Sequence, residues 1–399
     1  MSKKHHILIL TYWSYDDALI QAYTLPYLKI IKQLSPEQIS IHLVTFEKST
    51  PKKLSFQIDQ SILSKHIPLT YLPFGAKSGF EWIKSLFYLR KYIKANQITM
   101  IHSWCTPAGM IAYLLHKITG ISFVSDSFEP HAESMVENGT WKKNSPAFKI
   151  LFYFEKKIVK NAAHLISIAP GMNEYINNKF NIHLPELPVK PACVDLNKFQ
   201  ISAKNYSLAP EINFEEKLVC LYAGKFGGIY YETEVFDFFK VAADYLDKKI
   251  HFLILTGEKV NYINEKIKLS GNDPDLFTIK YVNHSEIQEW MGLADFAICP
   301  VKPVPSKKYC SPIKTGEYWA MGLPVIITNN ISNDSAIIEN SGLGYVWKSM
   351  ERQEYINSVQ RIKELLGSDK NTVSKKIRQL AERHRNYAIP EKIYRTIYL

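Results

Sequence analysis

The sequence predicts an α/β protein with two domains, each built on a doubly wound parallel sheet. Short apolar runs recur along the chain, amphipathic segments separate them, and the pattern starts again after a proline-rich stretch. Strands buried on both faces are apolar throughout, so these runs favour parallel sheets covered by helices on both sides. The chain of 399 residues is long enough for two such domains.

The first half of the chain contains five runs that we predict to be strands, at residues 5–10, 41–46, 99–102, 121–126 and 164–169. Helical patterns lie between them, from about Ala18 to Leu34 and over residues 80–95 and 107–118. Residues 184–199 are rich in proline and begin no obvious helix, so we expect the interdomain linker there.

The second half repeats the arrangement, with predicted strands at residues 217–224, 251–257, 277–282, 295–300 and 323–328. Helical segments again separate the strands. In doubly wound sheets ligands bind beyond the carboxyl ends of the strands, so we expect the chemistry in those loops, in a cleft between the two domains.

The composition excludes several other classes of protein. Apolar residues make up 46% and charged residues 22% of the chain, which excludes wholesale disorder. The five cysteines are scattered, which excludes a disulfide framework and predicts a cytoplasmic location. The first apolar run is too short for a signal peptide, and no stretch approaches the roughly 18 apolar residues of a membrane-spanning helix.

The net charge of +11 is unevenly distributed, because residues 1–200 carry +9, residues 201–350 carry −3 and residues 351–399 carry +5. A basic half of this kind suits either a nucleic acid or an anionic membrane surface. The sequence contains no nucleic-acid-binding motif, so we do not expect a nucleic acid partner.

The most informative segment is KKYCSPIKTGEYWAMGLPVIIT (307–328), where a loop leads into a helix that bears Lys314 and Glu317. A helix N-terminus presents free backbone N–H groups, which suit a phosphate or a sugar hydroxyl. Glu317, about one turn into the helix, is placed to accept hydrogen bonds from a ribose diol. Spacing alone equally allows Glu317 to be a solvated helix carboxylate.

Part of the segment 307–328, SPIKTGEYWAMGLPVI, resembles the donor-site signature of the retaining GT-B glycosyltransferases of the large family 4 group. The resemblance is to the branch with S-P-x-K-x-x-E-Y. Four more segments resemble motifs of this family in the correct order: AHLISIAPGM (163–172), KPACVDLNKF (190–199), LVCLYAGKFGG (218–228) and YVNHSEIQEWMGLADFAICP (281–300). The resemblance implies the GT-B fold, with two Rossmann-like domains facing a cleft. It implies an acceptor-binding domain at 1–188, a nucleotide-sugar-binding domain at 189–383, and a helix at 384–399 that crosses back to the first domain.

The resemblance also implies a donor site in the second domain. Glu317 matches the glutamate that holds the donor ribose, and Gly224 and Lys225 match the Gly-Arg pair that meets the diphosphate. Lys314 and the backbone of Ser311, Pro312 and Ile313 are implied to face the diphosphate and the donor sugar. The loop of Tyr281, Val282, Asn283 and His284 is implied to line the nucleobase. We expect a donor of the UDP or GDP type, with no cofactor and no metal, because two cations and a helix N-terminus would neutralise the leaving diphosphate.

Three positions depart from the family pattern. Tyr309 stands where the first glutamate of a full E-x7-E motif is usual, so recognition of the donor sugar is altered. Residues 227–230 lack the second basic residue that usually follows Lys225, and Ala192-Cys193 replaces the usual Asn-Gly of the linker. A catalytically inactive copy therefore stays open as an alternative.

A second segment, residues 124–141, places His131 among the carboxylates of Asp126, Glu129, Glu133 and Glu137. Mutual repulsion makes such a concentration unusual in a structural loop. The family often has a histidine after this strand, near the donor sugar and the acceptor, so His131 and Glu129 are our catalytic candidates. An exposed acidic loop with a bystander histidine is the alternative, and the spacing of a metal site is absent.

The loop at residues 11–23 also follows a strand. Tyr12, Trp13 and Asp16 are our candidates for stacking on an acceptor sugar and binding its hydroxyls. An ordinary contribution of these aromatic rings to the core is equally compatible with the sequence.

The leading hypothesis is therefore transfer of a sugar from a nucleotide sugar to a hydroxyl, with retention, in bacterial-type surface glycan or glycolipid assembly. One alternative is an inverting GT-B transferase that uses His131 or Glu129 as general base. Another is a basic nucleic-acid- or membrane-binding protein without catalysis.

The basic first half predicts peripheral attachment to an anionic membrane, with a lipid-linked or membrane glycan as acceptor. Residues 141–160 have six lysines against one glutamate, and the basic tail at 384–399 would add to this charge. The predicted helix at 80–95 has apolar residues on one face and lysines on another: Trp82, Leu86, Leu89 and Ile93, against Lys84 and Lys91 with Lys77 one heptad earlier. The alternative is that this apolar face packs on the sheet and the lysines are merely solvated.

Overall fold

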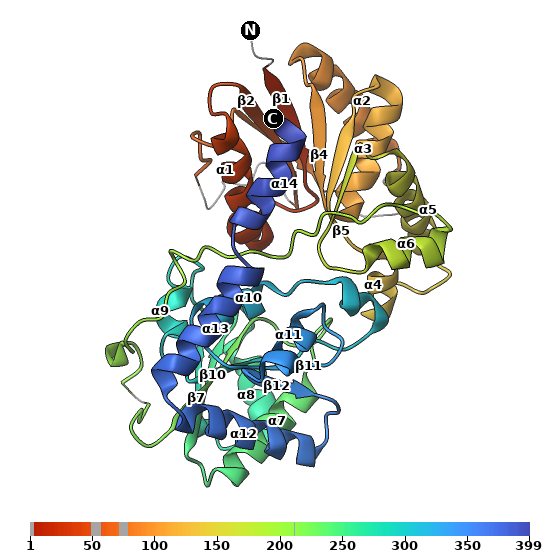
Figure 1. Cartoon of the computed structure of the whole chain (residues 1–399). Coiled ribbons are helices and arrows are strands. Elements are labelled where there is room, and N and C mark those ends of the chain that lie inside the picture. Colours follow the sequence, from red (N-terminus) through yellow and green to blue (C-terminus); the bar gives the residue numbers. More distant parts are fainter. Residues whose placement is uncertain (1–3, 49–56, 72–78, 211) are drawn as a thin grey trace. The chain divides into compact units, whose positions relative to one another are not determined.

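The structure is a computed structural model that describes residues 4–48, 57–71, 79–210 and 212–399 (Figure 1). It divides into two compact units, the first consisting of Met1–Pro191 with Ala388–Leu399 and the second of Ala192–Tyr387. The boundary at Pro191 lies inside the proline-rich stretch. Each unit has its own sheet and its own core.

The sheet of the first unit has six parallel strands in the order β3-β2-β1-β4-β5-β6. In chain order they are β1 (His5–Leu10), β2 (Ile39–Glu47), β3 (Lys65–Thr70), β4 (Met100–Trp104), β5 (Phe123–Phe128) and β6 (His164–Ser167). Ile7 to Leu10 of the central strand β1 are fully buried, as expected for a strand covered on both faces.

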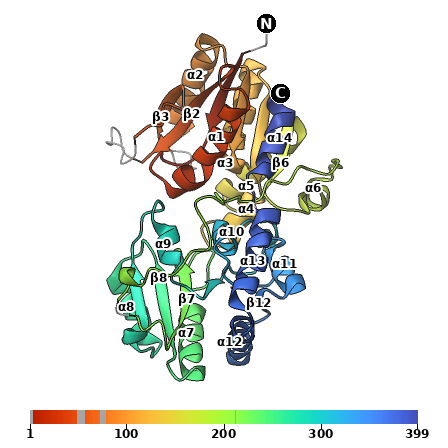
Figure 2. The same ribbon diagram turned by 60° about the vertical axis from the view of Figure 1, so that its left-hand side comes forward.

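Helices cover both faces of this sheet (Figures 1 and 2). On one face, α1 (Leu25–Leu34), which continues a π-helical turn at Ile20–Thr24, packs against the C-terminal helix α14 (Ala388–Tyr398). On the other face, α2 (Gly79–Ala95), α3 (Cys105–Thr119) and α5 (Pro146–Asn161) lie in sequence, α3 between the other two. The shorter helices are α4 (His131–Glu137) and α6 (Met172–Phe180).

A buried polar cluster joins α14 to the first unit. The hydroxyl of Tyr394 donates to Asp126 on β5 at 2.7 Å, and the hydroxyl of Tyr398 lies 2.5 Å from Nδ1 of His102 on β4. Lys190 forms an ion pair with Asp126 at 3.1 Å, with both side chains fully buried. Burial alone would raise the pKa of Asp126, but the Lys190 ammonium and the hydrogen bonds from His102 and Tyr394 outweigh it and lower the pKa to about 2.

The second unit repeats the topology, with six parallel strands in the order β12-β11-β10-β7-β8-β9. They are β7 (Leu218–Ala223), β8 (Ile250–Leu255), β9 (Phe277–Lys280), β10 (Phe296–Cys299), β11 (Val325–Thr328) and β12 (Gly344–Trp347). The helices are α7 (Thr233–Tyr245), α8 (Val260–Leu269), α9 (Ile287–Met291), α10 (Ile313–Ala320), α11 (Asp334–Ser341), α12 (Arg352–Gly367) and α13 (Lys370–His384). Alternate residues of β7 point into two cores, one shared with α10 and α13 and the other with α7 and α12.

Each sheet has one edge strand that the sequence did not predict. Strand β3 (KHIPLT) contains Pro68 and buries only Ile67 fully, so it lacks the continuous apolar run of an inner strand. Strand β12 (GYVW) is only four residues long and begins with glycine. Edge strands pair on one side only, so neither needs the apolar pattern on which the prediction relied.

The strand order of each sheet reverses direction beside its first strand, between β1 and β4 and again between β7 and β10. At such a switch point the loops after the two strands turn to opposite faces and leave a crevice where ligands bind. In the second unit these loops contain Gly224 and Lys225 after β7, and residues 300–312 after β10. Across the described residues, every helix is too short or too polar to span a lipid bilayer.

Candidate functional site

The N-terminus of α10 lies at the switch point of the second unit. Strand β10 is followed by a 3-10 turn at Pro305–Tyr309 and then by Ser311 and Pro312, which precedes the first helical residue, Ile313. Proline at the N-cap has no side-chain oxygen to accept from the backbone N–H groups of the first turn. This helix end therefore keeps its donors and its positive dipole available for an anion.

Lys314, on the first turn of α10, aims its ammonium at the loop after β7. Its side chain is 9% exposed, and within the described part of the chain its Nζ is buried without a hydrogen-bond partner. The Nζ atom lies 4.0 Å from the ring centroid of Tyr230 and 4.8 Å from that of Tyr222. A Cβ atom at residue 224 would stand 2.5 Å from this Nζ, and the backbone there has φ +143°, so only glycine allows the approach.

Burial lowers the pKa of Lys314 to about 8, although Cys299 and Glu317 act in the opposite direction; nearby Lys225 adds to the lowering. A buried ammonium without a hydrogen-bond partner is costly, because it has lost its water and has gained no direct contact in exchange. An anion bound here would supply both a hydrogen-bond partner and a negative charge. The geometry is therefore suited to a phosphate or diphosphate.

Glu317 of α10, His284 and Lys198 form a row of hydrogen-bonded side chains. Glu317 is 7% exposed, and its Oε1 lies 3.1 Å from Nε2 of His284, which belongs to the loop after β9. The ammonium of Lys198 lies 3.1 Å from Nδ1 of the same ring. An ammonium can only donate, so Nδ1 accepts and Nε2 carries the proton that it donates to Glu317. Burial lowers the pKa of Lys198, against the opposing effect of Glu317.

The other expected donor-site residues lie at the surface around this centre. Lys225 and Asn283 are exposed, and Tyr281 is 75% exposed, with its ring 4.0 Å from the position of a Cβ on Gly257. Tyr309 is half-buried, and the Lys308 ammonium lies 5.7 Å from the centroid of its ring.

The hydroxyl of Ser311 has a structural role that the sequence did not suggest. It accepts from the backbone N–H of Ala192 at 2.9 Å and from the buried guanidinium of Arg385. The same guanidinium donates to both carboxylate oxygens of Asp334, to Oδ2 at 2.6 Å. Arg385 and Asp334 are each 1% exposed, so this cluster fixes the turn before α10 from inside the unit. No pattern in the sequence links these four positions.

His131 and Glu129 come together in the first unit, at the carboxyl end of β5. Nδ1 of His131 lies 2.9 Å from Oε1 of Glu129, and both side chains are partly exposed. The segment that we expected to be a loop forms α4 from His131 onward. Glu155 of α5 accepts from the backbone N–H of Ala132 at 2.8 Å, and its complete burial raises its pKa to about 8.

Two other carboxylates of residues 124–141 have ion-pair partners of their own. Asp126 is buried in the sheet against Lys190, and Glu133 pairs with Lys179 at 2.6 Å. Over the residues that the structure describes, no group of three or more His, Cys, Asp and Glu side chains could hold a metal ion.

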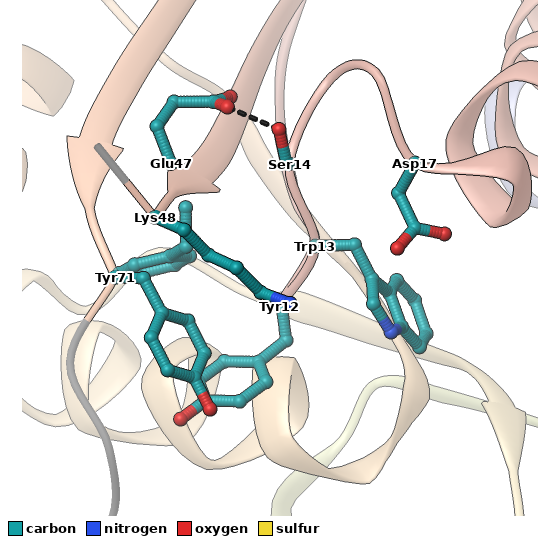
Figure 3. Close-up of a pocket in the computed structure, with 8 residues that line it drawn as sticks. Tyr12, Trp13, Ser14, Asp17, Glu47, Lys48 and Tyr71 are labelled. Carbon is teal, nitrogen blue, oxygen red and sulfur yellow. Dashed lines mark hydrogen bonds between the residues drawn. The ribbon is translucent and has the colours of Figure 1, made fainter. Parts of the chain in front are cut away.

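A pocket of about 330 Å³ opens beyond the carboxyl ends of β1, β2 and β3 in the first unit (Figure 3). Its lining residues are Tyr12, Trp13, Ser14, Asp17, Phe46, Glu47, Lys48 and Tyr71. Of the three residues that we expected to bind an acceptor, Tyr12 and Trp13 line the pocket, whereas Asp17 lines it in place of Asp16. Three other lining residues were not predicted from the sequence: Glu47 at the end of β2, Lys48 just after it, and Tyr71 just after β3.

Glu47 holds the loop after β1 in place. It accepts from the hydroxyl of Ser14 (Figure 3), from the backbone N–H of Tyr15 at 3.0 Å and from the hydroxyl of Thr45 at 2.6 Å. The ring of Tyr12 stacks on Trp82 of α2 at 6.2 Å between centroids, and burial raises the pKa of the Tyr12 hydroxyl. The pocket thus combines rigid aromatic surface with a lysine and a carboxylate.

Comparisons with known proteins agree with this architecture. Residues 217–364 match the family model described as "Glycosyl transferases group 1". The sucrose-phosphate synthase from Thermosynechococcus elongatus is similar in structure, with a TM-score of 0.75 at 15% sequence identity over 99% of each chain. WaaG, a glycosyltransferase involved in lipopolysaccharide biosynthesis, has a TM-score of 0.71 at 12% identity over 98% of this chain and 99% of its own.

The Anabaena protein HepE in complex with UDP-glucose also has a TM-score of 0.71, at 13% identity over 98% of this chain and 99% of its own. No curated protein sequence matches the chain. The structural matches confirm the predicted GT-B fold, with two six-stranded parallel sheets, each flanked by helices. The segment that matches the glycosyl transferases lies in the second unit and contains the Lys314 site.

Proposed function

We propose that this protein transfers a sugar from a nucleoside-diphosphate sugar to a hydroxyl group of an acceptor glycan or lipid. The ammonium of Lys314 at the N-terminus of α10, which is buried and has no hydrogen-bond partner among the described residues, carries the proposal. It lies inside the segment that matches the glycosyl transferases. A diphosphate is the ligand that would satisfy both the ammonium and the free N–H groups of the helix.

The donor would bind along the switch point of the second unit. Lys314, Lys225 and the first turn of α10 would hold the diphosphate, and Glu317, oriented by His284, would accept from the ribose hydroxyls. The nucleobase would lie against Tyr281 and Asn283. UDP and GDP are the proposed nucleotides, and one structural relative was solved in complex with UDP-glucose.

In the reaction, the bond between the anomeric carbon and the diphosphate oxygen breaks, and a bond to the acceptor oxygen forms. Lys314, Lys225 and the helix dipole would stabilise the negative charge on the departing diphosphate, so we propose that no metal is required. For a retaining transfer, the departing phosphate oxygen would accept the proton of the acceptor hydroxyl. No protein nucleophile is then needed.

A second candidate is an inverting transfer with His131 as general base. It is favoured by the 2.9 Å contact between Nδ1 of His131 and Glu129, which would orient the ring. The anomeric configuration of the first product separates the two mechanisms. Inversion, together with loss of turnover in Glu129→Gln, would favour the second.

The acceptor would bind in the pocket of the first unit. Trp13 and Tyr71 offer faces on which a sugar ring can stack, and Asp17 and Lys48 offer polar groups for its hydroxyls. Assembly of a surface glycan or glycolipid, at the inner face of an anionic membrane, is the proposed setting.

Thermal unfolding with a panel of UDP, GDP, ADP, CMP and their sugars tests the proposal. A nucleotide at about 100 times its dissociation constant should stabilise the protein by roughly 2.7 kcal/mol. The effect should disappear in Lys314→Met and persist in Lys363→Met, which changes an exposed lysine of the same unit. Absence of stabilisation by every nucleotide, or equal stabilisation of the Lys314→Met variant, would contradict the proposal.

A further inference from the structure

We propose that the outer surface of helices α2, α3 and α5 binds an anionic lipid bilayer. The three helices form one layer over the first sheet (Figure 1). The inference deepens the proposed membrane setting by naming the surface, and it does not depend on the transfer reaction.

Exposed apolar side chains are concentrated on this layer. Among the described residues of the first unit, nine large apolar side chains are exposed, and seven of them lie on these three helices. Phe80, Ile83, Phe87 and Tyr88 on α2 are 50–67% exposed. Ile118 on α3 and Ile150 and Tyr153 on α5 complete the set. Phe80, Ile83 and Phe87 lie within about two turns of one helix, and large exposed apolar side chains grouped in this way indicate an interaction site.

Helix α2 is apolar on two opposite faces. Leu89 and Ile93 are 1% and 2% exposed, and with Trp82 and Leu86 they form the face that packs into the unit. The apolar face identified in the sequence is therefore the inner one, as in the alternative in which it packs on the sheet. Phe80, Ile83 and Phe87 recur at helical spacing on the outer face and are 67%, 51% and 57% exposed.

Positive charge surrounds this outer face. The three helices carry nine lysines and arginines against two glutamates, and one of these, Glu155, is fully buried. The other, Glu81, pairs with Lys84 at 2.8 Å. Lysine ammonium groups also lie beside exposed rings, Lys84 over Phe80 at 4.5 Å and Lys157 over Tyr153 at 5.0 Å. Apolar side chains interspersed with lysines match the interfacial region of an anionic bilayer.

The composition of the surface favours lipid over other partners. Isoleucines at 83, 118 and 150 cannot stack on nucleic acid bases, and eight of the nine cations are lysines. A second copy would bring together two surfaces of the same positive sign. Helix α14 belongs to the first unit but packs with α1 on the opposite face of the sheet, so the charge of the basic tail is not part of this surface. Lys77 lies outside the described residues.

The surface is connected to the pocket of the first unit through α2. Trp82, on the inner face of the helix, stacks on Tyr12 of the pocket with an angle of 7° between the ring planes. If the pocket binds the acceptor, as proposed above, a bilayer bound to α2 would present a lipid-linked acceptor close to it. This last step alone rests on the proposed function.

Co-sedimentation of the full chain with vesicles tests the surface. We expect binding to vesicles of phosphatidylcholine with phosphatidylglycerol at low salt, weaker binding at high salt, and little binding to phosphatidylcholine alone. The triple variant Lys84→Gln, Lys91→Gln, Lys94→Gln should bind the anionic vesicles about 100-fold more weakly, because each lysine contributes about fivefold. The triple variant Phe80→Ser, Ile83→Ser, Phe87→Ser should bind more weakly but keep the salt dependence.

The matched control is Lys363→Gln, Lys375→Gln, Lys376→Gln, which removes three exposed lysines from the second unit and should bind as the unchanged protein does. Unfolding temperatures and UDP binding should be the same in all four proteins, so loss of vesicle binding is distinct from loss of the donor site. The proposal is overturned by absence of binding to anionic vesicles, or by equal loss in the control. Salt-sensitive binding of RNA without vesicle binding, or a dimer that the Phe80 variant abolishes, would overturn it as well.

Discussion

Replacing Lys314 by methionine should stabilise the protein while abolishing its nucleotide binding. The ammonium is buried beside Tyr230 and Gly224 without a hydrogen-bond partner in the described structure. Burial lowers its pKa from the ordinary 10.5 to about 8. Each tenfold loss of proton affinity corresponds to about 1.4 kcal/mol, so the charged form costs the folded state about 3 kcal/mol at neutral pH.

Methionine has a similar length, and its thioether packs well against the rings of Tyr222 and Tyr230. The variant loses the attraction of the ammonium for these rings, which is worth about 1 kcal/mol. We therefore expect a gain of about 2 kcal/mol in the free energy of unfolding at pH 7. For a unit of this size, that is an increase in unfolding temperature of about 5 °C.

The stability difference between the two proteins should depend on pH. The folded protein releases the Lys314 proton near pH 8, whereas the unfolded chain keeps it to about pH 10.5. Between these values the unfolded state binds more protons, so the contribution of Lys314 to stability rises with pH. The advantage of the methionine variant should accordingly shrink from pH 7 to pH 10.

Urea unfolding of both proteins at pH 7 and at pH 9, with calorimetric titration of UDP and UMP, measures these effects. Lys225→Met is the matched control for stability, because Lys225 is exposed and its removal should change the free energy of unfolding by less than about 0.5 kcal/mol. A variant of Lys314 that is less stable than the unchanged protein, or that binds UDP normally, would refute the reasoning.

Three further predictions follow from the same contacts. Glu317→Gln should weaken donor binding about 10- to 100-fold without lowering the unfolding temperature, because it removes a charged hydrogen bond to the donor. If calorimetry gives the variant the same donor affinity as the unchanged protein, Glu317 does not belong to the site. Glu155→Gln should stabilise the protein by about 3 kcal/mol at pH 7 and little at pH 4.5. The raised pKa of about 8 means that the folded state keeps a proton that the unfolded chain has lost, and a pH-independent difference in urea unfolding would contradict this. Arg385→Gln should lower the unfolding temperature and weaken UDP binding more than Asp334→Asn does, because it removes the donor to Ser311 as well as the ion pair. If the Arg385 variant binds UDP normally at a temperature where it is folded, the turn before α10 does not depend on Arg385.

The sequence by itself was sufficient for the inner strands and for the local part of the site. Buried parallel strands must be apolar throughout, so each inner strand is visible as a short apolar run, whereas the edge strands β3 and β12 are not. Lys314 and Glu317 lie three residues apart on one helix, so their neighbourhood follows from helical geometry alone.

Only the tertiary structure decided which distant residues complete the site. His284 reaches Glu317 from the loop after β9, Lys198 reaches His284 from another segment, and Arg385 reaches Ser311 from the end of α13. Contacts of this kind depend on how strands and helices pack, and a single sequence contains no periodicity that records them. The same limit explains why the sequence alone did not reveal the exposed apolar face of α2. Its residues are apolar on two opposite faces, so helical spacing cannot tell which face is buried, and packing against the sheet buried Leu89 and Ile93 and left Phe80, Ile83 and Phe87 exposed.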